Sequence, residues 1–244
     1  MDPASAMETR GWSRHRHLRG HLLLFGERRL PPHDHAAGVR LLTVAAGLEV
    51  TRLAAIGVLH PQTPLWVLLS LLLAVALASV PKLARVRLSR LGLRRWNEWS
   101  PTEKSYFLQV VLLASSFFLL VLIPAHWRAG GYPLLIRNLW SVLLPYLFFG
   151  FYQELVYRGM LQSELVRRWG APAGIVAANL LYTFGPLHWN YFGSSASTAW
   201  PMFVSIFLIG LFFGLLYHRS ANLWIPACFH AIGNAMIVWR LSAG

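Results

Sequence analysis

Four polar residues in the second half of the sequence have side chains that can together hydrolyse an acyl bond. Each lies within or beside apolar sequence: Glu154, His188, His230 and Asn234. A carboxylate and a histidine can hold a water molecule and remove its proton, while a second histidine and an asparagine amide can stabilise the oxyanion that forms. These residue types therefore predict acyl-transfer hydrolysis in an apolar environment.

Counting residues along the expected helices tests whether these side chains can meet. If the chain turns near Gly170, Glu154 lies 16 residues before the turn and His188 lies 18 residues after it. At 1.5 Å per residue these positions are about 24 and 27 Å from the turn, so antiparallel helices bring them to similar depth. His230 lies at a comparable depth in the last predicted helix, and Asn234, four residues on, shares its face.

The same residues are also compatible with roles outside catalysis. Glu154, His188 and His230 could bind zinc, although their spacing is not that of a standard zinc motif, and no other cofactor is expected. A single histidine in a membrane span is often an interhelical hydrogen-bond donor. Glu154 and Arg158 are four residues apart and can simply pair with each other.

Hydropathy predicts the elements that must position these residues. The chain has 244 residues, of which 56% are hydrophobic and 13% charged, whereas a soluble domain has about 25% charged residues. A membrane-spanning helix needs ~20 mostly apolar residues, and several apolar runs approach that length. The sequence therefore predicts an all-α fold, a polytopic transmembrane helix bundle with about seven spans. They are expected at residues 40–59, 65–80, 105–124, 138–160, 172–190, 202–217 and 223–240.

Two features inside the predicted spans indicate packing. Glu49 and Arg52 are three residues apart in the first span, so we expect an ion pair that faces the bundle. Gly210 and Gly214 form a small-xxx-small pattern, which allows two helices to approach closely.

Positive charge is concentrated in a few loops of this chain, whose formal net charge is +13. If the N-terminus is cytoplasmic, the basic segments 81–104, 161–171 and 218–222 all face the cytoplasm, as the positive-inside rule requires. Basic loops beside spans contact anionic lipids, so anionic lipids and not nucleic acid are the expected partners. We predict an integral membrane protein of a bacterial inner membrane, and the single cysteine, Cys228, excludes a disulfide within the chain.

Three short motifs carry a resemblance to a known family. They are Gln153-Glu154-xxx-Arg158, Phe184-xxx-His188 and His230-xxx-Asn234. In order and spacing they resemble the CAAX-protease and bacteriocin-processing family of glutamic-type intramembrane endopeptidases, over roughly residues 138–240. The chain then divides into a basic cytoplasmic tail (1–38), N-terminal transmembrane helices with a basic loop (39–137) and a core resembling the family's catalytic core (138–244).

The resemblance implies hydrolysis of a peptide bond near the end of a membrane-associated peptide or protein. It implies a water activated by a glutamate and a histidine, and an oxyanion site made by a histidine and an asparagine. The catalytic residues would be Glu154, His188, His230 and Asn234, and the supporting residues Gln153, Arg158 and Phe184.

One position departs from the family pattern, because the first glutamate of its Glu-Glu pair is Gln153 here. In the family that first acid is the one expected to activate water, and an amide cannot act as a general base. Three interpretations stay open. Glu154 takes over after a modest helix rotation, or Gln153 marks a non-catalytic relative, or Gln153 is an engineered change.

Two further functions compete with proteolysis. Gln153 suggests a catalytically degenerate membrane protein that acts as an immunity or scaffold factor. Polar residues at matched depth can also line a transport pathway, although the sequence shows no inverted repeat of the kind on which many transporters are built.

Overall fold

The computed structural model describes residues 34–60, 62–117, 120, 123–124, 127–128, 133, 136–137 and 139–241. Every regular element in these ranges is a helix, which confirms the all-α prediction for them. The predicted tail lies outside the described residues except for 34–38, where the Asp34 side chain caps the first helix by accepting from the Ala37 amide.

The helical elements follow one another with short connections. In chain order they are α2 (His35–Ala54), η2 (Ala55–Leu59), α3 (Leu65–Ser79), η3 (Val80–Ala84), η4 (Leu88–Leu91), η5 (Trp96–Glu98), α4 (Pro101–Phe117), η7 (Leu139–Leu143), α6 (Leu144–Glu154), η8 (Leu155–Gln162), α7 (Ser163–Trp169), α8 (Ala171–Phe184), η9 (Trp189–Gly193), α9 (Ala196–Ser220) and α10 (Trp224–Leu241).

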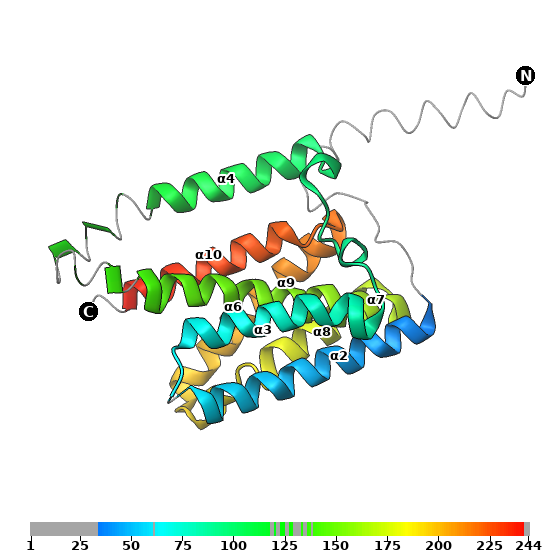
Figure 1. Ribbon diagram of the computed structural model, residues 1–244, viewed down its shortest axis with the longest axis horizontal. Coiled ribbons are helices and arrows are strands. Elements are labelled where there is room, and N and C mark those ends of the chain that lie inside the picture. The colour runs from blue at the N-terminus through cyan, green and yellow to red at the C-terminus, as the bar shows by residue number, and fades with distance from the viewer. Residues whose placement is uncertain are drawn as a thin grey trace, which may run out of the picture.

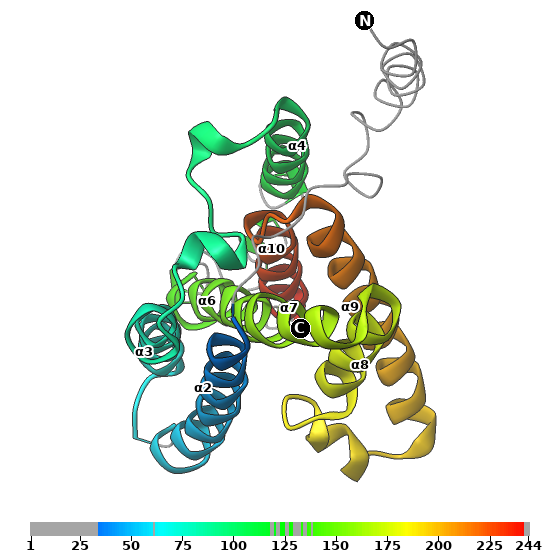
Figure 2. The same cartoon turned by 90° about the vertical axis from the view of Figure 1, so that its right-hand side faces the viewer.

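The long helices form a bundle around α6. Figure 1 shows them side by side along the longest axis, and Figure 2 shows the bundle nearly end-on. Helix α6 packs against α10 and α3, while α2 packs against η8 and α8 packs against α9. Helix α4 contacts the outer side of α10. The centre of the bundle therefore lies where α6 and η8 meet α8 and α10.

The central helix is continuous from η7 to α7, but its geometry changes in the middle. The segment η8 is π-helical and starts directly after Glu154. Its side chains are nearly all buried, among them Leu155, Val156 and Met160. Single π-helical turns inside α-helices occur frequently at functional sites, and this one carries the segment between Glu154 and Gln162.

Three described stretches are long and apolar enough to cross a membrane: His35–Leu59, Leu65–Ala84 and Ala196–Ser220. They contain the predicted spans 40–59, 65–80 and 202–217. The predicted number of about seven is not confirmed. Helix α8 is apolar but has only 14 residues, α6–η8 and α10 carry polar residues such as Glu154 and His230, and much of 118–138 lies outside the described residues.

The predicted span 172–190 is wrong at its end, because α8 stops at Phe184. Proline has no amide hydrogen and disfavours helical geometry in the residue before it. Gly185, which precedes Pro186, is extended with φ −82° and ψ −167°. His188 therefore lies in the connection between α8 and α9 and not on a continued helix.

Gly210 and Gly214 pack as predicted. An added Cβ at Gly210 would lie 2.2 Å from Asn179 Oδ1, and one at Gly214 would lie 2.8 Å from Gln162 Oε1. The Gly214 carbonyl accepts a hydrogen bond from Gln162 Nε2 at 2.8 Å. The two glycines thus bring α9 against η8 and α8.

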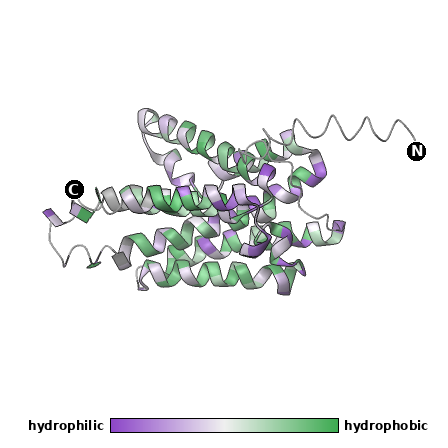
Figure 3. Ribbon diagram, turned by 90° about the horizontal axis from the view of Figure 1, so that it is seen from above, coloured by the Kyte–Doolittle hydropathy of each residue, from purple (hydrophilic) through white to green (hydrophobic). Residues whose placement is uncertain are grey.

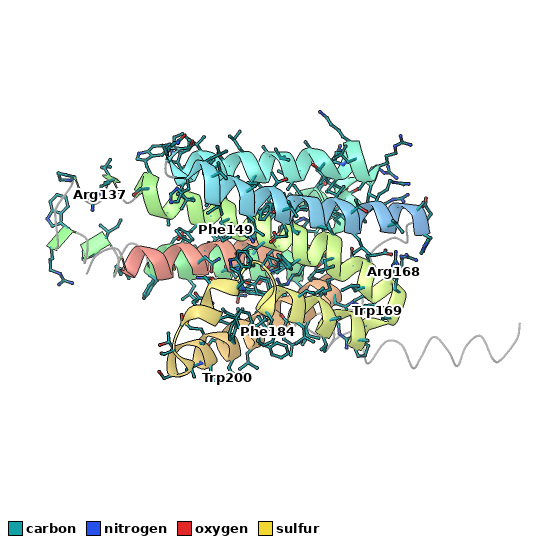
Figure 4. The ribbon with its side chains drawn as sticks, turned by 90° about the horizontal axis from the view of Figure 1, so that it is seen from below. Arg137, Phe149, Arg168, Trp169, Phe184 and Trp200 are labelled. Atoms are coloured by element: carbon teal, nitrogen blue, oxygen red, sulfur yellow. The ribbon has the colours of Figure 1, made fainter. Side chains whose placement is uncertain are left out.

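Basic segments gather at one end of the bundle. The Arg40 side chain near the start of α2 bonds the Ala84 carbonyl at the end of η3, and Arg94 donates to the Ser220 carbonyl at the end of α9. Figure 4 shows Arg168 and Trp169 towards one end of the molecule and Trp200 towards the other. Figure 3 shows hydrophobic colour along the lengths between the ends, as expected for a bundle that crosses a bilayer.

Candidate active site

The carboxylate of Glu154 lies at the centre of the bundle with no exposed surface. His230 Nδ1 is 2.6 Å from Glu154 Oε1, and Arg158 Nη1 is 3.4 Å from the same oxygen. The other carboxylate oxygen, Oε2, is buried and has no hydrogen-bond partner within the described part of the chain. One oxygen is therefore fixed, and the other is free to accept a hydrogen bond.

Arg158 connects three elements around this carboxylate. Its Nη2 donates to the Gly210 carbonyl of α9 at 2.9 Å. Its guanidinium also lies over the Tyr182 ring of α8, 4.2 Å from the ring centroid. Arg158 thus holds Glu154 while joining η8 to α8 and α9.

Both ring nitrogens of His230 have partners. A carboxylate can only accept, so Nδ1 donates to Glu154. Nε2 lies 3.2 Å from the Tyr182 hydroxyl, which donates to it when the ring is neutral. The ring is also stacked on Phe213, with centroids 5.3 Å apart. Because of these contacts His230 has no free N–H for an oxyanion.

Gln153 and Asn234 form a second contact between the same two helices. Asn234 Nδ2 donates to Gln153 Oε1 at 3.0 Å, and Gln153 is 2% exposed. The Gln153 amide group keeps two N–H donors and Asn234 keeps one. These amides are therefore donors beside Glu154.

A close approach of backbones makes this pairing possible. A Cβ built on Gly150 of α6 would lie 2.4 Å from Ala231 Cα of α10. Gly150 is four residues before Glu154, and Ala231 follows His230, so the tightest contact of α6 and α10 is adjacent to the carboxylate–histidine pair.

His188 reaches the site from the loop after α8. Its Nδ1 is 2.9 Å from the Tyr182 carbonyl, and that nitrogen must donate because a carbonyl only accepts. Nε2 of the neutral ring then carries a lone pair. Burial lowers the pKa of His188 to about 4, although the hydrogen bond to Tyr182 opposes this shift. The ring is therefore neutral at neutral pH.

Tyr182 joins the two histidines and was not identified from the sequence. Its hydroxyl contacts His230, and the edge of its ring faces His188 with centroids 5.0 Å apart. A tyrosine in an apolar run is not distinguishable from a core aromatic by pattern alone. Phe184, in contrast, is not brought to the site: it is 39% exposed and packs on Phe203, with centroids 5.1 Å apart.

The predicted Glu49–Arg52 ion pair is confirmed, with 2.9 Å between Arg52 Nη2 and Glu49 Oε2. Its contacts extend further than expected. Tyr152 and Tyr157 of the central helix both donate their hydroxyls to Glu49 at 3.1 Å. Arg52 also donates to the Pro186 carbonyl at 3.1 Å. The pair therefore links α2 to the central helix and to the loop that carries His188.

The alternative zinc site is not formed. Among the residues that the structure describes, no three His, Cys, Asp or Glu side chains are arranged to bind one metal ion. Tyr182 lies between His188 and His230, whose rings are 5.0 and 6.0 Å from it.

Comparison with known proteins covers the same part of the chain. The sequence profile of the family described as type II CAAX prenyl endopeptidase Rce1-like matches residues 133–236. The resemblance to the CAAX prenyl endopeptidase family is confirmed. This match includes the central helix, α8, α9 and the part of α10 with His230 and Asn234. Family and apolar helices together support an integral membrane protein.

A curated relative is an uncharacterized protein YpbD from Bacillus subtilis (strain 168). It is 24% identical over 136 residues, which cover 54% of this chain and 64% of that protein. The chain thus aligns with less than two thirds of the relative's length. No solved structure gives a significant match.

Proposed function

We propose that the protein is an intramembrane endopeptidase that cleaves a peptide bond near the end of a membrane-associated substrate. The observation that carries this proposal is the buried Glu154 carboxylate, with Oε1 held by His230 and Oε2 free. A carboxylate held by a histidine and left with one free oxygen can bind a water and accept its proton. The family match supports the same class of reaction.

In the proposed reaction Glu154 Oε2 takes a proton from water, and the hydroxide attacks the scissile carbonyl carbon. The carbonyl oxygen becomes an oxyanion. When the C–N bond breaks, the proton held by Glu154 passes to the leaving nitrogen. No metal is required for this balance, because water supplies both the nucleophile and the proton.

The oxyanion would be stabilised by the amides of Gln153 and Asn234. Both nitrogens of His230 are engaged by Glu154 and Tyr182, so His230 orients Glu154 instead. The Nε2 lone pair of His188 can accept a hydrogen bond from the attacking water. A donor placed at a developing oxyanion contributes about 10²–10³ in rate.

Peptide cleavage in reconstituted liposomes tests this proposal. Candidate substrates are peptides with a prenylated tail, a bacteriocin leader or a sorting-signal tail, and mass spectrometry would detect released fragments. We expect Glu154→Gln, His188→Ala and His230→Ala each to lower cleavage by about 10²-fold or more. The matched control Glu98→Gln removes an exposed carboxylate and should leave it unchanged. Unaltered cleavage in all three site variants would exclude the proposal.

Gln153 supports a second function, that of a membrane protein which binds a peptide end without cleaving it. It stands where the family has its first acid, it is buried, and it is already bonded to Asn234. Moving Glu154 into that place would break its contacts with His230 and Arg158. An immunity or scaffold factor would keep the pocket and lose turnover.

Restoring the acid distinguishes the two functions. If the protein is degenerate, Gln153→Glu should create cleavage where the unmodified protein has none, while peptide binding already exists. If Glu154 is the base, the unmodified protein cleaves, and Gln153→Glu lowers the rate because two adjacent carboxylates repel each other in a buried site.

A further inference from the structure

A groove between α2 and α3 lies apart from the candidate active site. It has a volume of about 430 Å³ and is lined by residues that include Arg40, Val44, Gly47, Leu48 and Val75. Figure 2 shows α2 and α3 at one edge of the bundle. A volume of this size is within the range of ligand pockets, about 300–1,000 Å³.

The walls of the groove offer apolar surface even where the residues are polar. Thr43 Oγ1 donates to the Val39 carbonyl at 3.1 Å, and Thr51 Oγ1 donates to the Gly47 carbonyl at 2.8 Å. Ser79 Oγ likewise donates within its own helix, to Val75 at 2.7 Å. Their hydroxyls are satisfied, so an occupant meets methyl and methylene groups along this surface.

The groove opens sideways from the bundle. Val75 is 45% exposed and Leu83, at the same side, is 62% exposed. From Arg40 to Thr51 it follows α2 for about 16 Å, at 1.5 Å per residue. Both helices belong to stretches long and apolar enough to span a membrane. An occupant can therefore enter from the hydrocarbon region of the bilayer.

One end of the groove is cationic. Arg40 Nε donates to the Ala84 carbonyl at 3.0 Å, which fixes the guanidinium there. Within the described ranges its two Nη groups have no protein partner. Lys82 and Arg85, both exposed, lie in the segment around Ala84. This end carries positive charge where a bilayer carries its headgroups.

We propose that the groove binds an anionic phospholipid, with one acyl chain along Val44, Leu48 and Val75 and its phosphate at Arg40. An apolar channel with a single fixed cation at its headgroup end is complementary to that chemistry. The site does not depend on the proposed peptidase activity, because the residues that form it are on α2, α3 and η3 alone.

Native mass spectrometry of the purified full-length protein tests the site, with phosphatidylglycerol and phosphatidylcholine of identical acyl chains. A Cβ on Gly47 meets no atom within 4 Å, and the same is true of Gly57, which does not line the groove. Gly47→Leu should fill the groove and abolish the phosphatidylglycerol adduct. The matched control Gly57→Leu should retain it, with similar thermal stability in both variants.

The cationic end is tested separately, and this arm decides the result if Gly47→Leu fails to fold. Arg40→Gln should weaken phosphatidylglycerol binding about fivefold and leave phosphatidylcholine unchanged, while Arg40→Lys keeps the preference. Equal adducts with Gly47→Leu and the unmodified protein, or no lipid preference, would overturn the proposal. Displacement by inorganic phosphate or by a farnesylated peptide would also overturn it, since either would assign the groove to another ligand.

Discussion

Glu154 keeps its place because charged and polar neighbours compensate for its burial. A carboxylate without exposed surface is costly unless it is paired and hydrogen-bonded. Here His230 and Arg158 share one oxygen, and Arg158 is itself 2% exposed. Breaking such a pair from one side leaves an uncompensated buried charge.

Arg158→Met should therefore lower the free energy of unfolding by about 3–5 kcal/mol. The change keeps apolar packing on Tyr182 but removes the partner of Glu154. Thermal or denaturant unfolding in detergent measures it. Arg219→Met, at an exposed position, is the control and should stay within about 0.5 kcal/mol. Equal stability of the two variants would show that Arg158 does not compensate Glu154.

Arg52 is expected to act with Glu49 as one unit. Arg52→Met leaves Glu49 charged among Tyr152 and Tyr157 and frees the Pro186 carbonyl, so it should destabilise the protein strongly. Adding Glu49→Gln should recover part of the loss, with a coupling energy of about 1–3 kcal/mol. A double-mutant cycle of unfolding free energies measures this coupling, and strict additivity would contradict it.

At the scale of elements, helix counting explains both the success and the error of the sequence-based site. Glu154, His230 and Asn234 were placed correctly on neighbouring helices, because regular helices convert residue number into depth. His188 was assigned to a helix that ends at Phe184. It still reaches Tyr182, because the loop turns back at Gly185-Pro186. Loop direction depends on tertiary contacts such as the bond from Arg52, and hydropathy does not contain them.

The spacing of α6 and α10 is set by Gly150. An added methyl group there would lie 2.4 Å from Ala231 Cα, which is backbone and cannot move aside. Gly150→Ala should separate the helices, destabilise the protein by about 1–3 kcal/mol and reduce any cleavage. Gly233→Ala on α10 is the matched control, because its Cβ meets nothing within 4 Å. Melting temperatures in detergent, with the cleavage assay beside them, should differ between the two variants.

For the whole molecule, composition was sufficient for the fold class but not for the number of spans. Apolar runs alone identify the stretches His35–Leu59, Leu65–Ala84 and Ala196–Ser220. The helices that build the site contain Gln153, Glu154, His230 and Asn234, and those residues make the sequence less apolar at the functional centre. Hydropathy is therefore weakest where the chemistry is concentrated.

Charge distribution predicts how the bundle is oriented in the membrane. The basic ends of α2, η3 and α9 lie together, and α9 extends over 25 residues, or about 37 Å, to the opposite end. With Cys228→Ser as background, Arg87→Cys and Arg219→Cys should react with a membrane-impermeant maleimide only after cells are permeabilised. Gln62→Cys and Thr198→Cys, at the other end, should react in intact cells.

All four labelling positions are exposed, so access to the thiol should depend on the side of the membrane and not on burial in the protein. The positive-inside rule places the ends with Arg87 and Arg219 in the cytoplasm, where anionic lipid headgroups would also meet Arg40. Labelling of Arg87→Cys in intact cells would reverse this orientation. Labelling of only one residue of either pair would mean that the two basic loops lie on different sides of the membrane, although the structure brings them into contact through Arg94 and Ser220.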